Sequence, residues 1–294
     1  MLKILALAGA ILAATAPAQV KSADTSQSVR EMVTNEIALQ KADRSHWMYR
    51  HQKANPEFTE LRHCVQASQG EVCREVERNG KPLTAEEQKK EDERIQVLLA
   101  SWRQQEQARK ERLEDGKKAL RLLNMLPDAF TYHYEGTEGP YVRLSFVPNP
   151  KFDPPTREAR VFHAMAGTLW LDASQKRLRK LQGHLTTDVE FGGGLLGCLY
   201  KGGSFEVQQT DLGDGIWEVT YLDVHILGKA LFFKTIRAQQ TETSTFIKRL
   251  PDDLSMARAA ELLDNSQSQT NAISSTNMSP APSSSKLEPL RGSN

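Results

Sequence analysis

The cysteines are the residues of this chain whose spacing points most directly to chemistry. Cys64 and Cys73 flank a predicted turn at Ala67-Ser68-Gln69-Gly70, whose glycine can take the positive φ of a tight reversal. With the turn centred between Ser68 and Gln69, the two cysteines lie directly opposite each other on paired strands. We predict a Cys64–Cys73 disulfide, since exported proteins meet an oxidising compartment. The alternative is two reduced thiols that face apart.

The remaining reactive residues form no recognisable catalytic or metal-binding pattern. Cys198 has no base near it in sequence, and we interpret it as a packed strand residue. The seven histidines lack H-E-x-x-H spacing, no Cys/His cluster has zinc-site spacing, and G-x-S-x-G is absent. Asp188 and Glu190 share a strand face, a pairing that is common by chance. The sequence therefore predicts no catalytic residue, no metal site and no enzymatic activity.

A glycine-rich run over residues 192–197 matches G-x-G-x-x-G literally. The dinucleotide fingerprint needs a strand before this run and a helix after it. Here another strand pattern follows, over Ser204 to Gln209, so we predict no nucleotide and no cofactor. We interpret the glycines as residues that allow a bend or bulge in a curved sheet, or a close approach of a helix.

These residues must be positioned by a predicted antiparallel meander between about Arg157 and Lys248. Five segments there alternate apolar and polar residues at period two, which is typical of strands with one face on a core. No helical pattern interrupts them, so neighbouring strands should pair antiparallel. We predict an α+β fold, with a strongly curved sheet of about ten strands that forms a half-barrel around helices.

The flanking segments supply further strands and the covering helices. Thr84 and Glu87 have capping-box spacing, and a helical region then runs to Leu126, before Pro127. Its charged middle, residues 104–118, should separate two helices rather than continue one rod. The other expected elements are an N-terminal helix over 26–41, strands over 47–51, 58–66 and 71–78, a hairpin over 130–147, and a C-terminal helix over 252–263.

Both ends of the chain have the composition of non-globular segments. Lys3, an apolar run and Ala16-Pro17-Ala18 fit a secretory signal, so we expect cleavage near Ala18 and a periplasmic or secreted protein. Residues 265–294 are mostly small and polar, which predicts a disordered tail. We therefore expect a signal peptide over 1–18, one domain over 19–264 with a helical insertion at 84–126, and the tail.

The charges nearly cancel, since 38 Lys and Arg residues face 37 Asp and Glu residues among 294. Such a balance gives no reason to expect a nucleic-acid partner, and no stretch reaches the length of a membrane span.

Alternation places ten apolar residues on the concave side of the sheet. They line a ligand cavity if the core is incompletely filled, and are dry core if it is full. They are Met165, Leu169, Leu181, Leu185, Val189, Phe205, Val207, Trp217, Val219 and Tyr221.

The order of the predicted elements resembles the LolA-like superfamily of lipoprotein carriers, which includes LolB-like and LppX-like proteins. Residues 167–172, Gly-Thr-Leu-Trp-Leu-Asp, and residues 176–181, Lys-Arg-Leu-Arg-Lys-Leu, look like a hairpin that recurs in this superfamily. The pieces over 160–165 and 190–197 also look like an exported bacterial family of uncharacterised proteins. The carrier resemblance implies a half-barrel that holds an acyl chain in its concave face, with the helices as a lid.

We therefore expect an exported, non-enzymatic protein that binds a lipid, an acyl chain or a lipoprotein. Burial of an acyl chain contributes roughly 0.8 kcal/mol per CH₂, so no polar motif is required for affinity. The first alternative is a cell-envelope interaction or sensor module of the same fold, with a protein partner and no ligand. The second is an envelope hydrolase whose catalytic groups converge from distant positions.

Overall fold

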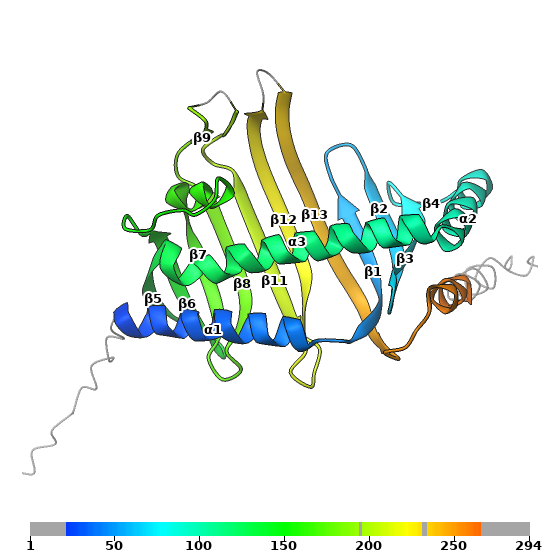
Figure 1. Cartoon of the computed structure of the whole chain (residues 1–294), viewed down its shortest axis with the longest axis horizontal. Helices are drawn as coiled ribbons and strands as arrows, with labels where there is room; N and C mark the ends of the chain where they lie inside the picture. Colours follow the sequence, from blue (N-terminus) through cyan, green and yellow to red (C-terminus); the bar gives the residue numbers. More distant parts are fainter. Residues whose placement is uncertain (1–21, 194–195, 231–233, 266–294) are drawn as a thin grey trace, which may run out of the picture.

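One large antiparallel sheet dominates the structure, a computed structural model that describes residues 22–193, 196–230 and 234–265 (Figure 1). Eleven of its thirteen strands follow the order β4-β3-β2-β1-β13-β12-β11-β8-β7-β6-β5, and this curved sheet does not close into a barrel. The predicted α+β class with a curved antiparallel sheet is confirmed. The strands are β1 His46–Ala54, β2 Thr59–Ala67, β3 Gly70–Arg78, β4 Lys81–Pro82, β5 Phe130–Glu138, β6 Tyr141–Pro148, β7 Met165–Asp172, β8 Arg177–Leu185, β9 Val189–Phe191, β10 Gly197–Leu199, β11 Ser204–Asp211, β12 Trp217–Ala230 and β13 Lys234–Leu250.

The predicted meander is present as β7, β8, β11, β12 and β13, each paired antiparallel with the next. β9 and β10 form a small excursion between β8 and β11, and the positive φ values of Gly192 and Gly193 begin the turn that joins them. The meander starts later than expected, because residues 158–164 form a 3-10 helix, η1 (Glu158–Ala164). β13 returns beside β1, so the last strand lies next to the first.

Two long helices, α1 (Ser22–Ala42) and α3 (Trp102–Ala129), cross the same face of the sheet (Figure 1). We call this the inner face and its reverse the outer face. A third helix, α2 (Ala85–Ala100), precedes α3, and residues 256–265 form a helix near the C-terminal end of the described chain. No helix among the described residues is long and apolar enough to cross a membrane.

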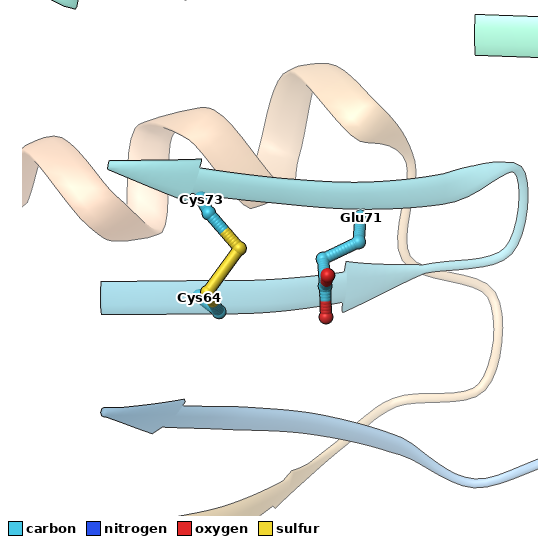
Figure 2. Close-up of side chains that lie close together, drawn as sticks. All are labelled: Cys64, Glu71 and Cys73. Atoms are coloured by element: carbon cyan, nitrogen blue, oxygen red, sulfur yellow. A yellow bond between two sulfur atoms is a disulfide. The ribbon is translucent and has the colours of Figure 1, made fainter. Parts of the chain in front are cut away.

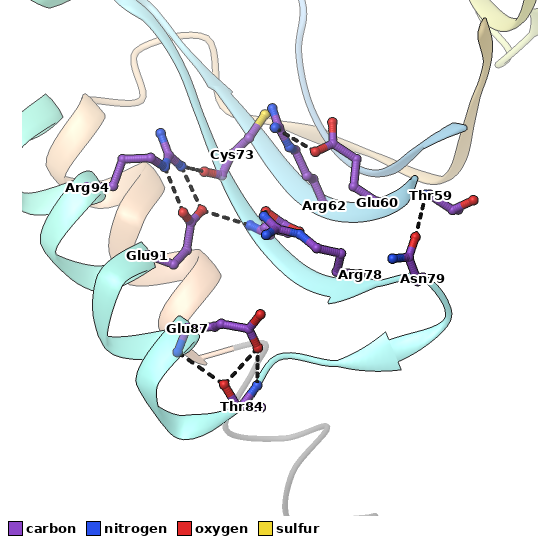
Figure 3. Close-up of polar contacts among 11 residues, drawn as sticks. Thr59, Glu60, Arg62, Cys73, Arg78, Asn79, Thr84, Glu87, Glu91 and Arg94 are labelled. Carbon is purple, nitrogen blue, oxygen red and sulfur yellow. Dashed lines mark hydrogen bonds and ion pairs between the residues drawn. The ribbon is translucent and has the colours of Figure 1, made fainter. Parts of the chain in front are cut away.

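The capping box predicted for the start of α2 is confirmed. The Thr84 hydroxyl accepts from the Glu87 amide, and the Glu87 carboxylate accepts from the Thr84 amide at 2.8 Å (Figure 3). One turn later, the Glu91 carboxylate accepts from the Glu75 amide at 2.9 Å, and Arg94 donates to the Cys73 carbonyl (Figure 3). These bonds fasten α2 to β3.

The predicted break of the helical region at residues 104–118 is wrong. α3 continues through the charged segment and past Pro127 to Ala129, and the break falls at Ser101, which caps α3 by accepting from the Gln104 amide. Ion pairs three or four residues apart stabilise this exposed segment, including Arg109 with Glu106. Together with strong helix formers, they favour a continuous rod over a solvated link.

Direct cross-strand partners share a face of an antiparallel sheet, so the register traces the inner face across the molecule. One row runs through neighbouring strands as Leu169, Leu181, Val207, Leu222, Glu242, Lys53 and Glu60. It is apolar from β7 to β12 and charged from β13 to β2. The Lys53 ammonium and the Glu242 carboxylate lie 3.7 Å apart.

The sheet therefore carries two apolar clusters on opposite faces. α1 packs Val29 and Met32 on the inner face of β5 to β8. At the other end of the sheet, Met48 and Lys53 point to opposite faces of β1, and Lys53 lies on the inner face. Met48 therefore lies on the outer face, in a row with its cross-strand neighbours Val65 and Val72. That outer row packs against α2 and the helix over residues 256–265. The alternation of apolar residues predicted one concave core, whereas the structure has a second cluster on the outer face.

The expected signal peptide over 1–18 lies outside the described residues, as does the expected tail except for residue 265.

Candidate ligand cavity

Half of the residues predicted to line a cavity instead fill the core. Leu169 is 1% exposed between α1 and the sheet, and Leu185 and Val189 are buried in a small cluster beside η1. Met165 and Leu181 are partly buried and pack against the α1 cluster. For these five residues, the alternative of a dry core is the one that the structure favours.

The inner face stays partly open farther along the row, on β11 and β12. Phe205 and Val207 on β11, and Leu222 and Val224 on β12, are only partly buried, and Val219 is 49% exposed. α1 makes its main sheet contacts with β5 and β8, so it leaves these strands uncovered. The result is a strip of apolar side chains along two neighbouring strands.

Tyr221 does not belong to this strip. The register of β11 and β12 shifts between Gln208 and Gln209, so that Gln208 pairs with Tyr221 and Gln209 with Val219. Since Leu222 shares the inner face with Val207, its neighbour Tyr221 points to the outer face. The bulge adds one residue and reverses the alternation on which the prediction relied.

A cavity of about 360 Å³ lies at the end of the strip, between the C-terminal turns of α1 and the β11–β12 hairpin. Trp217 and Val219, two of the ten residues predicted to face a cavity or a dry core, line it. Leu39 and Ile216 add further apolar surface. Trp217 is 7% exposed, and its indole donates to the Gln175 side chain at 3.0 Å. The lining of this cavity is polar as well as apolar, because it includes the carboxyl groups of Asp43, Asp214 and Glu218.

An ion pair between Glu36 and Arg177 forms part of the lining. Arg177 Nε donates to Glu36 Oε1 at 2.9 Å, and the same oxygen accepts from the Leu178 amide at 2.8 Å. Both charged side chains are less than a tenth exposed. Arg177 also donates to the Gly215 carbonyl at 3.1 Å and lies 5.7 Å from the Trp217 ring centre. The guanidinium is therefore already paired, and it shapes the cavity by holding the hairpin.

A smaller cavity of about 90 Å³ adjoins the first, and Glu218 and Val219 line both. β12 pairs with β13 only from Tyr221 onward, so Trp217, Glu218 and Val219 pair with β11 alone. Trp47 and Ile247 reach into this opening from β1 and β13. Because β12 and β13 are not paired here, the smaller cavity lies between them.

Two groups beside the smaller cavity have shifted pKa values. Burial raises the pKa of the Glu218 carboxyl, and the nearby Asp43 carboxylate adds to the shift. Burial, reinforced by Glu71, also raises the pKa of the Tyr49 hydroxyl, which donates to the Glu71 carboxylate at 2.5 Å. Burial is the largest cause of both shifts, so they reflect packing around the cavity.

The two cysteines predicted to pair are joined by a disulfide across β2 and β3. Their Cα atoms lie 4.1 Å apart, and Cys64 and Cys73 are direct cross-strand partners (Figure 2). Glu71 lies close to both sulfurs (Figure 2). Because the sulfurs are bonded to each other, they are not thiolates and do not form a metal site with that carboxylate.

Cys198 is a free, partly buried cysteine of β10, and burial raises its pKa.

A more open hollow of about 520 Å³ lies beside Gly167 and Gly183 in β7 and β8. Its charged lining residues already have partners: Glu206 pairs with Lys180, and Asp223 accepts from Thr241 at 2.6 Å. We place the candidate site at the cavity beside Trp217, because two of the ten predicted residues, Trp217 and Val219, line it, whereas only Phe205 lines this hollow.

No family model matches this chain, and no curated protein matches it. Among solved structures, the chain is similar to the crystal structure of a DUF1329 family protein from Desulfovibrio piger. The match covers 76% of this chain and 95% of that chain, with 10% sequence identity and a TM-score of 0.23. A likeness at that score assigns neither a family nor an activity.

Proposed function

We propose that this protein is an exported, non-enzymatic binding protein that holds an acyl chain of a lipid or lipoprotein. The observation that carries the proposal is the partly exposed apolar strip on the inner face of β11 and β12, which leads to the cavity beside Trp217. Elsewhere on β5 to β8, α1 buries the same face. An acyl chain laid along the strip would remove the remaining apolar surface from water, at roughly 0.8 kcal/mol per CH₂.

α3 supports this proposal by its position. It crosses the inner face in front of the sheet (Figure 1), and its main contacts are at its two ends, with α1, β5 and η1 on one side and with α2 and β3 on the other. Most side chains of its middle, residues 107–119, are exposed. The rod is therefore held at both ends rather than packed on β11 and β12. The resemblance to LolA-like carriers implies the same arrangement of lid and concave face.

The charges of the cavity favour a neutral acyl group. Asp43, Asp214 and Glu218 carry carboxyl groups among its lining residues, and the single lining guanidinium, Arg177, is paired with Glu36. A free fatty-acid anion would meet like charges there without an available cation. An acyl chain in ester or amide linkage, as in a phospholipid or a lipoprotein, has no such charge on its carbonyl end.

Titration with a fluorescent acyl ester tests this proposal, using two variants of β12 as a matched pair. Val224→Glu places a charge on the inner strip, whereas Leu227→Glu places it on the outer face, where Leu227 is 41% exposed. We expect Val224→Glu to weaken binding about tenfold, the equivalent of losing about two buried CH₂ groups. Leu227→Glu should bind like the parent chain, and the probe as a free acid should bind less tightly than the ester.

Two results would oppose the proposal. Equal affinity of the two variants would place any ligand away from the strip. The absence of saturable uptake by the delipidated parent chain would show that the strip holds no acyl group.

A protein-interaction module of the same fold is the second candidate. Val97, Trp102 and Leu113 on α2 and α3 are 54%, 70% and 50% exposed, and such side chains suit a partner surface. Recovery of one stoichiometric partner that Trp102→Ser fails to capture, with no bound lipid, would favour this candidate.

A further inference from the structure

Phe246 occupies an unusual backbone position on β13. Its φ is +52°, in the left-handed region that bulky side chains rarely adopt, and its side chain is 74% exposed. A phenylalanine there has neither a favourable backbone nor a buried ring. Such local strain points to a role for the exposed ring itself.

The surrounding register explains how the ring is presented. Arg50 of β1 pairs with Thr245 and Met48 with Lys248. Phe246 and Ile247 therefore lie opposite Tyr49 alone, and this one extra residue makes a bulge. The Arg50 guanidinium lies 4.3 Å from the centre of the Phe246 ring, and Arg50 belongs to the outer row of β1. The bulge therefore points Phe246 outward, while Ile247 lines the smaller cavity.

The charge around this ring is positive. Lys248 is exposed, and among the described residues neither Arg50 nor Lys248 forms an ion pair. Neighbouring side chains on the outer row, such as Gln52 and Thr243, are uncharged. His63, the partner of Arg50 on β2, adds no charge near neutral pH, because burial and the Arg50 charge lower its pKa.

We infer that Arg50, Phe246 and Lys248 form a docking surface for the anionic surface of a lipid bilayer. A protruding aromatic ring favours the boundary between headgroups and acyl chains, and flanking cations favour anionic phosphates. A bilayer fits better than a folded partner, because the 74% exposed ring protrudes from the outer face between two cations. The ligand proposal is not required for this inference, although the same bulge borders the cavity through Ile247.

Flotation of the full chain with phosphatidylcholine vesicles, with and without phosphatidylglycerol, tests the inference. We expect binding only with the anionic lipid, and a loss of about tenfold in Phe246→Asn. The double variant Arg50→Gln/Lys248→Gln should lose about thirtyfold and much of the salt dependence. Trp102→Ser is the control, since Trp102 is 70% exposed on α3 with Arg103 at 5.8 Å from its ring.

The expected loss of vesicle binding in Phe246→Asn would not be caused by unfolding, because asparagine tolerates the left-handed backbone region. The melting midpoint of Phe246→Asn should equal or exceed that of the parent chain. Equal vesicle binding by the parent chain and Phe246→Asn would overturn the inference. So would the loss of binding in Trp102→Ser alone, or the absence of binding to any vesicle.

Discussion

Glu36 on α1 and Arg177 on β8 form a buried ion pair between residues 141 positions apart in sequence. The same carboxylate oxygen also accepts from the Leu178 amide, so α1 is tied to the backbone of the sheet as well as to a side chain. This contact fixes the C-terminal turns of α1 over the β11–β12 hairpin, where the candidate cavity lies.

Removal of one partner should leave a buried charge without compensation. We expect Arg177→Met to lower the free energy of unfolding by about 3–5 kcal/mol, and Glu36→Leu to do the same. The double variant should lose less than the sum of the two, because no unpaired charge remains. Urea denaturation of the four proteins gives the coupling energy, and strictly additive losses would contradict the pairing.

The Cys64–Cys73 disulfide closes a short loop, with a sequence separation of nine. Its removal should therefore cost only about 2 kcal/mol of unfolding free energy. Denaturation of Cys64→Ala/Cys73→Ala, and of the parent chain with and without a dithiol reductant, measures this loss. Cys198→Ser is the control and should respond to the reductant like the parent chain. A parent chain whose unfolding is insensitive to the reductant would argue against the bond.

The Glu218 carboxyl should make stability depend on pH. Its pKa is raised in the folded state by burial and by Asp43, so the folded chain holds its proton more tightly than the unfolded chain. The resulting stabilisation is present below the ordinary value of 4.5 and is lost as the pH rises through the folded pKa. Glu218→Gln should therefore be more stable than the parent chain at neutral pH and nearly equal to it in acid.

Chemical denaturation at neutral pH and below pH 4.5 checks this expectation. Glu190→Gln, at an exposed carboxyl on β9, is the matched control. A stability gain of Glu218→Gln that is the same at both pH values would indicate a packing effect rather than a titration.

Local patterns in the sequence predicted much of the fold. Alternation gave the strands of the meander, the spacing of Thr84 and Glu87 gave the start of α2, and the turn after Ala67 aligned Cys64 with Cys73. These features depend on residues that are close in sequence, where the geometry of a turn or a helix determines the contact.

The candidate site was less predictable, because it depends on contacts between distant segments. The pairing of Glu36 with Arg177 has no local signal. The bulge that turns Tyr221 outward arises from the pairing of β11 with β12, and not from the composition of either strand. The continuity of α3 did have a signal, since the segment with Glu106 and Arg109 is rich in helix formers with ion-pair spacing.

The central claim is that the inner strip of β11 and β12 holds an acyl chain, and the mass of the purified protein tests it most directly. The protein, isolated from its native host, would be weighed under native conditions and again after organic extraction, together with Val224→Glu. We predict a stoichiometric acyl species that is released by extraction and is depleted in the variant. A clean apo mass, with no uptake of added phospholipid or lipopeptide, would contradict the account.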